Sequence, residues 1–441
     1  MTIKTFFLFF LVLFSMNLML ANHNSSKSNF HAKTSSNLKI SEKHQVFDFY
    51  SPIVINGNQE MEDLATSEGW SGTGSADNPF ILENLEFSSM SVNYQLEINN
   101  TNHHFIIRNS KFSDGGKGGI KLDAVSNALI TDNIFINNSG DALFLVSSSN
   151  AIISHNVING TKGIPTYSDV DGFTNYPFSI DVRRSTDIIV EHNLLYNNHD
   201  GIWLWLNVSN SIVRGNEVYN TIVYEGLGAG GSTQSFNNII RDNIIDTIGR
   251  YGLWVLSDTG GSIFENNTIR KTTSKAIFLS NVQNSTITNN TVDHAGTEGV
   301  HIAGPTSVFN SMRHNLIINS QLHGLRLEGG NNLVQENTFI DNNKGNGKQA
   351  IQFSQGPNQI THNYWNDWTS PDTDNDGIVD NPYVLDGIDG QDNFPLVLSP
   401  RERTNTSSTT PSTTSFGVIT NTVLAFGITI ILKKIKNRPR I

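Results

Sequence analysis

Apolar and polar positions follow one recurring pattern along most of the chain. Each unit has an apolar pair, a polar pair, an asparagine, a second short apolar run and a polar turn, then Gly or Ala before an apolar-x-apolar segment. Residues 128–136 and 188–196 show the first part, and residues 142–145 and 201–204 show the last. Short apolar runs bounded by polar turns are typical of buried strands. The pattern therefore predicts three short strands per unit.

The asparagine recurs at intervals that are mostly 22 to 27 residues, with a longer interval of 37 between Asn156 and Asn193. Such a period is typical of solenoids, whose units bury their apolar sides by stacking about 4.8 Å apart. We predict an all-β fold, a parallel β-helix of about eleven rungs. Because asparagine tolerates left-handed backbone angles and its amide can bond the next rung, we expect a stacked row in a tight turn. The row would comprise Asn109, Asn133, Asn156, Asn193, Asn216, Asn243, Asn267, Asn290, Asn315, Asn337 and Asn363.

The amino-terminal residues predict export. Residues 1–21 have one early lysine, an apolar run and a small final residue, as a secretory signal peptide does; an uncleaved anchor is the alternative. Residues 22–45 are polar and without period, which indicates a disordered linker. Residues 46–100 would form an N-terminal cap and the first rungs, and residues 101–368 the β-helix repeats.

The carboxyl-terminal residues predict an anchor. Residues 369–399 would form an Asp-rich C-terminal cap loop, and residues 400–415 are a Ser/Thr-rich stretch typical of a surface stalk. Residues 416–432 are apolar and would form a single transmembrane helix, with the basic residues 433–441 on the cytoplasmic side. A buried core helix is the alternative. We expect a single-pass protein of the cell membrane with its repeat domain outside the cell.

Composition removes several classes of function. The formal net charge of −11 argues against nucleic acid as a partner, because phosphate contacts require a basic surface. The chain has no cysteine, which excludes disulfides, thiol catalysis and zinc–cysteine sites. Several Asn-x-Ser/Thr sequons would suit an extracellular glycoprotein, although an asparagine-rich repeat also produces them by chance. They include Asn99, Asn137, Asn159, Asn207, Asn266, Asn284 and Asn289.

Two motifs flank the repeats. An entry motif, Gly-Trp-x-Gly-x-Gly…Asn-Pro-Phe-Ile-Leu, occupies residues 69–82, and an Asn/Asp/Trp-rich exit motif occupies residues 363–383. Together with the repeats they resemble the NosD-like, carbohydrate-binding and sugar-hydrolase (CASH) class of right-handed parallel β-helix proteins. The resemblance implies that fold. The class includes pectate-lyase-like enzymes, epimerases, surface proteins and a copper-maturation protein, so it implies no single activity.

One outward face of the predicted helix could bind sugars. Side chains alternate across a strand, so the middle residue of each apolar-x-apolar segment should point outward. Trp203, Trp205 and Trp254 are such residues, and exposed indole faces are surfaces on which sugar rings stack. We predict that these three residues bind substrate. An insertion over residues 162–177 is expected to overhang the same face.

Candidate catalytic residues lie beside these tryptophans. Asp181 and Asp200 could supply the two carboxyl groups of a glycoside hydrolase, and Arg183 could neutralise a substrate carboxylate in a lyase or epimerase. A second cluster falls on two consecutive rungs and includes histidine, which can act as acid or base near neutral pH. It comprises Glu298, His301, His323, Arg326 and Glu328. Solvated polar residues are the alternative for both groups.

A loop after the repeats predicts a metal site. Carboxylates alternate at Asp372, Asp374 and Asp376, followed by Gly377 for a tight bend. The backbone carbonyl of Ile378 and the carboxylate of Asp380 continue the pattern of a calcium loop. Calcium, bound mainly in a structural role, is the cofactor that we predict; an Asp/Gly-rich surface turn is the alternative.

Three functions remain open at this point. The first is a membrane-anchored cell-surface protein that binds an extracellular polysaccharide and, as a hydrolase, lyase or epimerase, could process it. The second is a non-catalytic surface-layer or adhesion protein on the same scaffold. The third is a NosD-like accessory protein for metal maturation, which would need a His/Met cluster. An enzyme needs at least two titratable groups with shifted pKa values beside the tryptophans, whereas a binder needs only aromatic rings and hydrogen bonds.

Overall fold

The computed structural model describes residues 47–88, 93–163, 166–167, 174–175, 178–354 and 356–401. The predicted signal peptide, linker, transmembrane helix and basic tail therefore lie outside the described residues, as does the predicted stalk beyond Arg401. Within the described part of the chain, no helix is both long and apolar enough to span a bilayer. The body that begins at Phe47 is described below by itself.

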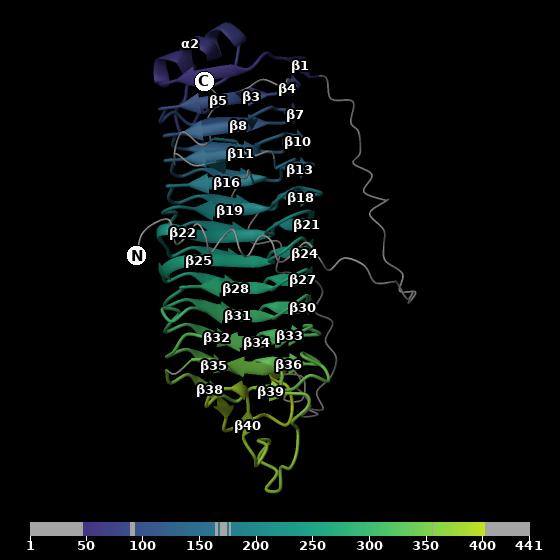
Figure 1. The fold of residues 1–441 in the computed structure, drawn as a ribbon. Helices are drawn as coiled ribbons and strands as arrows, with labels where there is room; N and C mark the ends of the chain where they lie inside the picture. The colour runs from purple at the N-terminus through teal and green to yellow at the C-terminus, as the bar shows by residue number, and fades with distance from the viewer. Residues whose placement is uncertain are drawn as a thin grey trace, which may run out of the picture. The chain divides into compact units, whose positions relative to one another are not determined.

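Almost all of the described residues belong to a parallel β-solenoid of about eleven turns with very little helix, as predicted. Three sheets run along it (Figure 1). In each, a strand pairs in parallel with the equivalent strand of the preceding and following turns. The predicted three strands per unit are confirmed.

Sheet A contains β1 (Asp48–Phe49), β4 (Leu85–Ser88), β7 (Lys111–Ser113), β10 (Ile134–Ile136), β13 (Val157–Asn159), β18 (Leu194–Tyr196), β21 (Glu217–Thr221), β24 (Ile244–Ile248), β27 (Thr268–Thr272), β30 (Thr291–Ala295), β33 (Leu316–Ile318), β36 (Thr338–Ile340) and β39 (Tyr364–Trp365). Sheet B contains β2 (Ile53–Asn56), β5 (Tyr94–Asn99), β8 (Gly118–Asp123), β11 (Asp141–Val146), β16 (Ile180–Arg183), β19 (Ile202–Trp205), β22 (Leu227–Phe236), β25 (Leu253–Gly260), β28 (Ile277–Ser280), β31 (Val300–Ala303), β34 (Leu325–Leu327), β37 (Ala350–Gln352) and β41 (Asp386–Gly387). Sheet C contains β3 (Phe80–Glu83), β6 (Phe105–Arg108), β9 (Ala128–Thr131), β12 (Ile152–Ser154), β17 (Ile189–Glu191), β20 (Ile212–Arg214), β23 (Ile239–Arg241), β26 (Ile263–Glu265), β29 (Thr286–Thr288), β32 (Ser311–Arg313), β35 (Leu333–Gln335) and β38 (Gln359–Thr361).

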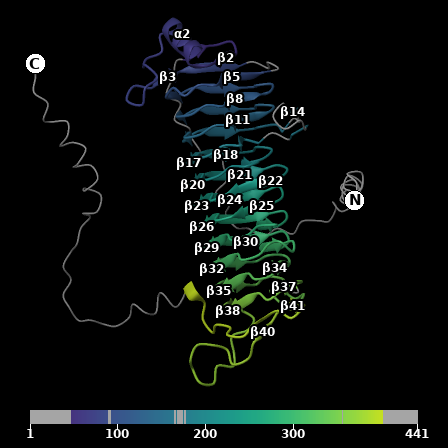
Figure 2. The ribbon, with the colours of Figure 1, turned by 90° about the vertical axis from the view of Figure 1, so that its left-hand side faces the viewer.

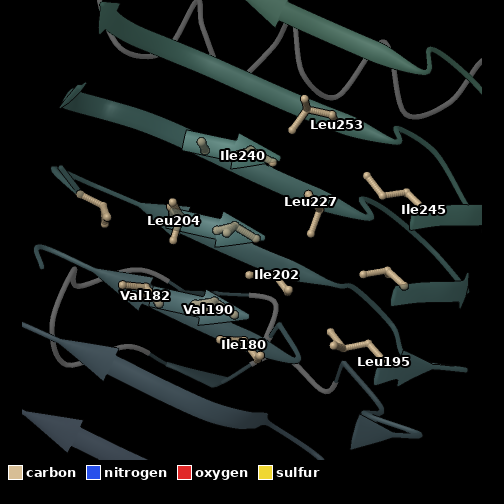
Figure 3. Close-up of a cluster of buried hydrophobic side chains, with 14 of the residues drawn as sticks. Ile180, Val182, Val190, Leu195, Ile202, Leu204, Leu227, Ile240, Ile245 and Leu253 are labelled. Atoms are coloured by element: carbon tan, nitrogen blue, oxygen red, sulfur yellow. The ribbon is translucent and has the colours of Figure 1, made fainter. Parts of the chain in front are cut away.

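Alternation of side chains across each strand builds the core. Leu204 of β19 and Val190 of β17 are fully buried and point between the sheets, as Figure 3 shows for several rungs. Equivalent side chains stack from rung to rung: the rings of Phe112 and Phe135 lie 5.0 Å apart and nearly parallel. One unit therefore buries its apolar side only against its neighbours.

The asparagine row forms a buried hydrogen-bonded ladder between sheets C and A. Asn243 is typical: its Oδ1 accepts from the backbone N and Nδ2 of Asn216, and its Nδ2 donates to Val213 O and Asn267 Oδ1. Asn109 was wrongly included, because Ser110 occupies the equivalent position and its backbone N donates to Asn133 Oδ1. The left-handed backbone conformation was predicted at the ladder asparagine itself, but it occurs at the residue before it. Asp242, which precedes Asn243, has a φ of 57°.

Different segments contact the first and last rungs of the described stack. Helix α2 (Asn58–Glu68) lies beyond the first strands (Figure 1), and its Met61 is completely buried in the core. At the other end, the Tyr383 ring stacks on Trp365 at 4.2 Å. The Asp392 carboxylate there accepts from the backbone N and Nδ2 of Asn363, which terminates the asparagine ladder. Two short antiparallel pairs, β14 (Thr166–Tyr167) with β15 (Thr174–Asn175) and β40 (Tyr383–Val384) with β42 (Gln391–Asp392), lie outside the three sheets.

Candidate functional site on the outer face of sheet B

One column of outward side chains runs along sheet B through its central strands. Register places these residues directly above one another, one per rung. From the amino-terminal end the column reads Lys121, Phe144, Asp181, Trp203, Gly228, Trp254, Phe278, His301 and Arg326. A second outward column, two residues further along, includes Arg183 and Trp205. Most candidate residues therefore share one face of the molecule.

The tryptophans are less exposed than the sequence analysis predicted. Trp203 is only 1% exposed, because Phe178 stacks on it at 5.3 Å and Trp205 and Trp254 pack around it at 5.2 and 5.3 Å. The prediction that Trp203 forms an open platform is wrong. Trp205 and Trp254 are half-buried, and Trp254 continues through stacking contact to Phe278 at 6.3 Å. Open aromatic surface is therefore confined to the margins of this cluster.

A buried acid cluster adjoins the aromatic column at its amino-terminal side. Asp181 is 0% exposed and forms an ion pair with Arg183, with Oδ2 2.5 Å from Nη2. Asp141, which the sequence analysis missed, accepts from the Tyr94 hydroxyl at 3.0 Å and from Phe178 N at 2.8 Å. Burial, followed by the nearby Asp181 charge, raises the pKa of Asp141 to about 7. The carboxyl groups of Asp141 and Asp181 can therefore hold one proton near neutral pH.

Asp200 is brought near the same face but into a different set of contacts. Its Oδ2 lies 2.9 Å from His199 Nδ1, and its Oδ1 accepts from the backbone N of Glu225 at 3.1 Å. The structure pairs Asp200 with Glu225 on the next rung and Asp181 with Arg183. Burial, reinforced by the Asp200 charge, raises the pKa of Glu225 to about 8. Glu225 could have been found from the sequence, because it precedes a Gly-apolar-x-apolar segment as Asp200 does.

The second predicted cluster is largely assembled. Arg326 donates to Glu328 Oε1 at 2.8 Å and lies 3.6 Å from Glu298, and His301 Nε2 lies 3.1 Å from Glu328 Oε1. Burial lowers the pKa of His301 to about 4, so its ring is neutral at pH 7. His323 is not part of the group, because its Nε2 lies 3.3 Å from Oδ2 of Asp386, which is two rungs further along the sheet.

Several buried polar atoms on this face lack a hydrogen-bond partner among the described residues. They include Trp203 Nε1, Glu225 Oε1, Trp254 Nε1 and His301 Nδ1. A buried donor or acceptor without a partner costs about 1–3 kcal/mol, so such groups are normally satisfied by protein, water or a ligand. Their position beside aromatic rings marks the face between Trp203 and His301 as a candidate binding surface.

Three of the four predicted carboxylates of the aspartate loop lie together, and Asp380 is not in that group. Ligand atoms of Asp372, Asp374 and Asp376 lie within 4.8 Å of one another, the one such group of three or more found among the described residues. Backbone N–H groups orient them: Gly377 N donates to Asp372 Oδ2, and Ile378 N donates to Asp376 Oδ1. The Asp380 carboxylate accepts from Thr373 N and Oγ1. Oxygen donors in this number suit a hard cation such as calcium.

Two family models match overlapping parts of the chain. Residues 179–387 match the model described as periplasmic copper-binding protein (NosD), and residues 23–218 match the right handed beta helix region. No curated protein matches the chain.

The chain is similar to several solved structures at low sequence identity. The periplasmic alginate epimerase AlgG is 14% identical over 72% of this chain and 77% of that chain, with a TM-score of 0.35. The A-module of the mannuronan C-5 epimerase AlgE4 from Azotobacter vinelandii is 11% identical over 71% and 95%, with a TM-score of 0.40. The exopolygalacturonase from Thermotoga maritima is 10% identical over 66% and 74%, with a TM-score of 0.36. We infer no activity from these similarities. Together the two model matches span residues 23–387, and with the described parallel solenoid they support a NosD-like family of right-handed parallel β-helix proteins for this chain.

Proposed function

We propose that the outer face of sheet B, from Asp141 to Arg326, binds a carbohydrate chain. The observation that carries this proposal is the set of unpartnered polar atoms beside the aromatic column. Trp203 Nε1 and Trp254 Nε1 are donors, Glu225 Oε1 is an acceptor when ionised, and His301 Nδ1 is either. A sugar hydroxyl both donates and accepts, so one class of ligand can satisfy all of them.

The aromatic margins supply the apolar part of the same contact. Trp205 and Trp254 are half-buried and keep part of their indole surface open. Indoles combine a flat apolar face with an N–H donor, which suits the alternating apolar and hydroxyl-bearing surfaces of a sugar ring. Because the column spans consecutive rungs about 4.8 Å apart, it favours an extended polymer over a single sugar.

Processing of the bound chain is the finer part of the proposal. Asp141 with Asp181 and Asp200 with Glu225 each provide two carboxyl groups on the face, and two of these four groups have strongly raised pKa values. Shifted pKa values in adjacent groups are typical of acid–base sites, although structural ion pairs shift them too. For this reason we propose that the face is the active site of an enzyme, with a non-catalytic adhesion protein as the second candidate.

Attachment and metal binding complete the proposal. The apolar residues 416–432 would hold the chain in the membrane and keep its repeat domain outside the cell. Calcium on Asp372, Asp374, Asp376, Asp380 and the carbonyl of Ile378 would fix the loop that follows the last rung. A role in metal maturation has no specific observation in its favour.

Binding of the detergent-solubilised full chain to a panel of neutral and acidic polysaccharides tests the proposal. Trp254→Ala should weaken binding at least about tenfold, the effect of losing roughly 1.4 kcal/mol. Phe309→Ala is the matched control, because Phe309 is 60% exposed and precedes a strand of sheet C. Equal affinity of Trp254→Ala and wild type for every bound polysaccharide, or no binding at all, would overturn it.

Turnover separates an enzyme from an adhesin. Asp181→Asn and Glu225→Gln should retain binding but lose product release if the carboxyl groups act on the ligand. Binding of the wild type without any product would favour the adhesion protein and leave the binding face in place.

A further inference from the structure

The outer face of sheet C carries a stripe of aliphatic side chains. In eight consecutive strands, from β3 to β26, register places Ile or Leu at one outward position, and every one is half-buried. At about 4.8 Å per rung the stripe extends roughly 34 Å along the sheet. Four of its strands, β17, β20, β23 and β26, lie one below another in Figure 2. The stripe comprises Ile81, Ile106, Leu129, Ile152, Ile189, Ile212, Ile239 and Ile263.

A second outward column, two residues further along each strand, carries an ordered set of charges over the first six rungs. In register it reads Glu83, Arg108, Thr131, Ser154, Glu191 and Arg214. Arg108 Nε donates to Glu83 at 2.7 Å, and Arg214 Nε donates to Glu191 at 2.7 Å. The signs are therefore negative, positive, neutral, neutral, negative, positive. Read in the opposite direction, every charged position changes sign and the neutral ones stay neutral.

We propose that this face joins two copies of the chain in an antiparallel, two-fold symmetric interface centred between the rungs of Thr131 and Ser154. A two-fold axis that lies in the interface along the strand direction reverses the order of the rungs and keeps each column opposite itself. The aliphatic stripe then packs on the partner's stripe. Glu83 faces the partner's Arg214, and Arg108 faces the partner's Glu191. This proposal does not depend on the carbohydrate site.

The order of charges along the column favours a second copy of the chain, packed in the antiparallel orientation. With the rungs in the same direction, Glu83 would face the partner's Glu83 and Arg108 would face the partner's Arg108, and juxtaposed like charges disfavour association. In the antiparallel orientation the Glu83–Arg108 ion pair lies opposite the ion pair of the partner's Glu191 with the partner's Arg214. Each carboxylate then faces a guanidinium. An uncharged lipid surface would desolvate both ion pairs and offer them no opposite charge of its own, which disfavours it as the occupant.

The size of the overlap predicts a weak association. Six rungs span five spacings of about 4.8 Å and, with the width of one strand added, extend about 29 Å; strands of three to four residues are about 10–13 Å long. The facing stripes therefore bury roughly 300–400 Å² per copy, less than the roughly 800 Å² per partner of a standard stable interface. We expect a reversible dimer.

Crosslinking tests the register, because the chain has no cysteine and each introduced one is unique. Detergent-solubilised full chains carrying Thr131→Cys are treated with a short bismaleimide. Covalent dimers are expected, because the two-fold axis brings the Thr131 positions of the two copies within about one rung, 4.8 Å, of each other along the sheet. Thr288→Cys is the control, since Thr288 is half-buried like Thr131 and occupies the same column outside the overlap. Equal crosslinking of the two variants, or of neither, overturns the proposed interface.

Sedimentation of the same full chains provides a second readout. Arg214→Glu should weaken the dimer at least about tenfold, whereas Arg313→Glu, in the same column beyond the overlap, should leave it unchanged. A wild-type chain that stays monomeric over the whole accessible concentration range overturns the proposal, as does equal weakening by the two variants. Circular dichroism of each variant separates a lost interface from a lost fold.

Discussion

The Trp203 indole lies directly against Gly228, which follows it on the next rung of sheet B. A Cβ built on Gly228 would come 1.8 Å from Cε3 of Trp203. Real side chains do not approach so closely, so the absence of a side chain at Gly228 is what gives the indole its place. A glycine in a strand is often a site of such close approach.

Gly228→Ala should therefore displace Trp203 and destabilise the protein by about 1–3 kcal/mol, the usual cost of overpacking a filled site. Urea unfolding measures the change. Adding Trp203→Leu should recover part of the loss, because the smaller side chain leaves room for the new methyl group. Simple additivity of the two single changes would contradict the contact.

Stability should fall as pH rises from about 4 to 8. Burial raises the pKa of Asp141 to about 7 and of Glu225 to about 8, whereas carboxyl groups of an unfolded chain titrate near pH 4. The folded protein thus holds these protons more tightly than the unfolded chain does. Their contribution to stability is fully present below about pH 4 and is lost as pH rises through the folded-state pKa values, by up to about 1.4 kcal/mol per pH unit for each group.

Urea unfolding at several pH values measures this dependence. Glu225→Gln should reduce the slope between pH 5 and 8, because the amide does not ionise. Glu217→Gln is the control, since Glu217 is exposed on sheet A. A slope that Glu225→Gln leaves unchanged would show that other groups cause the pH dependence.

Removal of one ladder amide should be costly. Asn243→Ala leaves the buried backbone N of Asn216 and the carbonyl of Val213 without their side-chain partners. Each buried unsatisfied group costs about 1–3 kcal/mol, so we expect a loss of about 2–5 kcal/mol in unfolding free energy. Asn346→Ala, at an exposed position, should change stability by less than about 0.5 kcal/mol. Similar losses in the two variants would contradict the ladder's role.

Calcium should raise the midpoint of thermal unfolding. A ligand that binds only the folded state stabilises it by about 2.7 kcal/mol at a hundred times its Kd. The double variant Asp374→Asn/Asp376→Asn removes two of the three clustered carboxylates and should abolish the shift, whereas Asp63→Asn in the exposed part of α2 should not. If millimolar calcium leaves the unfolding midpoint of the wild type unchanged, the predicted calcium site is wrong.

Much of the fold follows from the sequence alone. A three-strand unit buries little by itself, so the repeated apolar pattern is compatible with stacking and little else. The pattern also predicts which face of sheet B carries Asp181, Trp203 and His301, because side chains alternate strictly along a strand. The position of the asparagine ladder follows from the same register, apart from its first member, Asn109.

Tertiary structure alone decided what those outward residues meet. Exposure depends on neighbours from other rungs and from the end of the insertion, so the sequence could not show that Phe178 covers Trp203 or that Asp200 bonds the backbone of Glu225. Asp141 joins the candidate site through contacts with Tyr94 and Phe178, which lie far from it along the chain. Periodicity determines the direction in which a side chain points, whereas packing between units determines whether water, a ligand or another side chain lies beyond it.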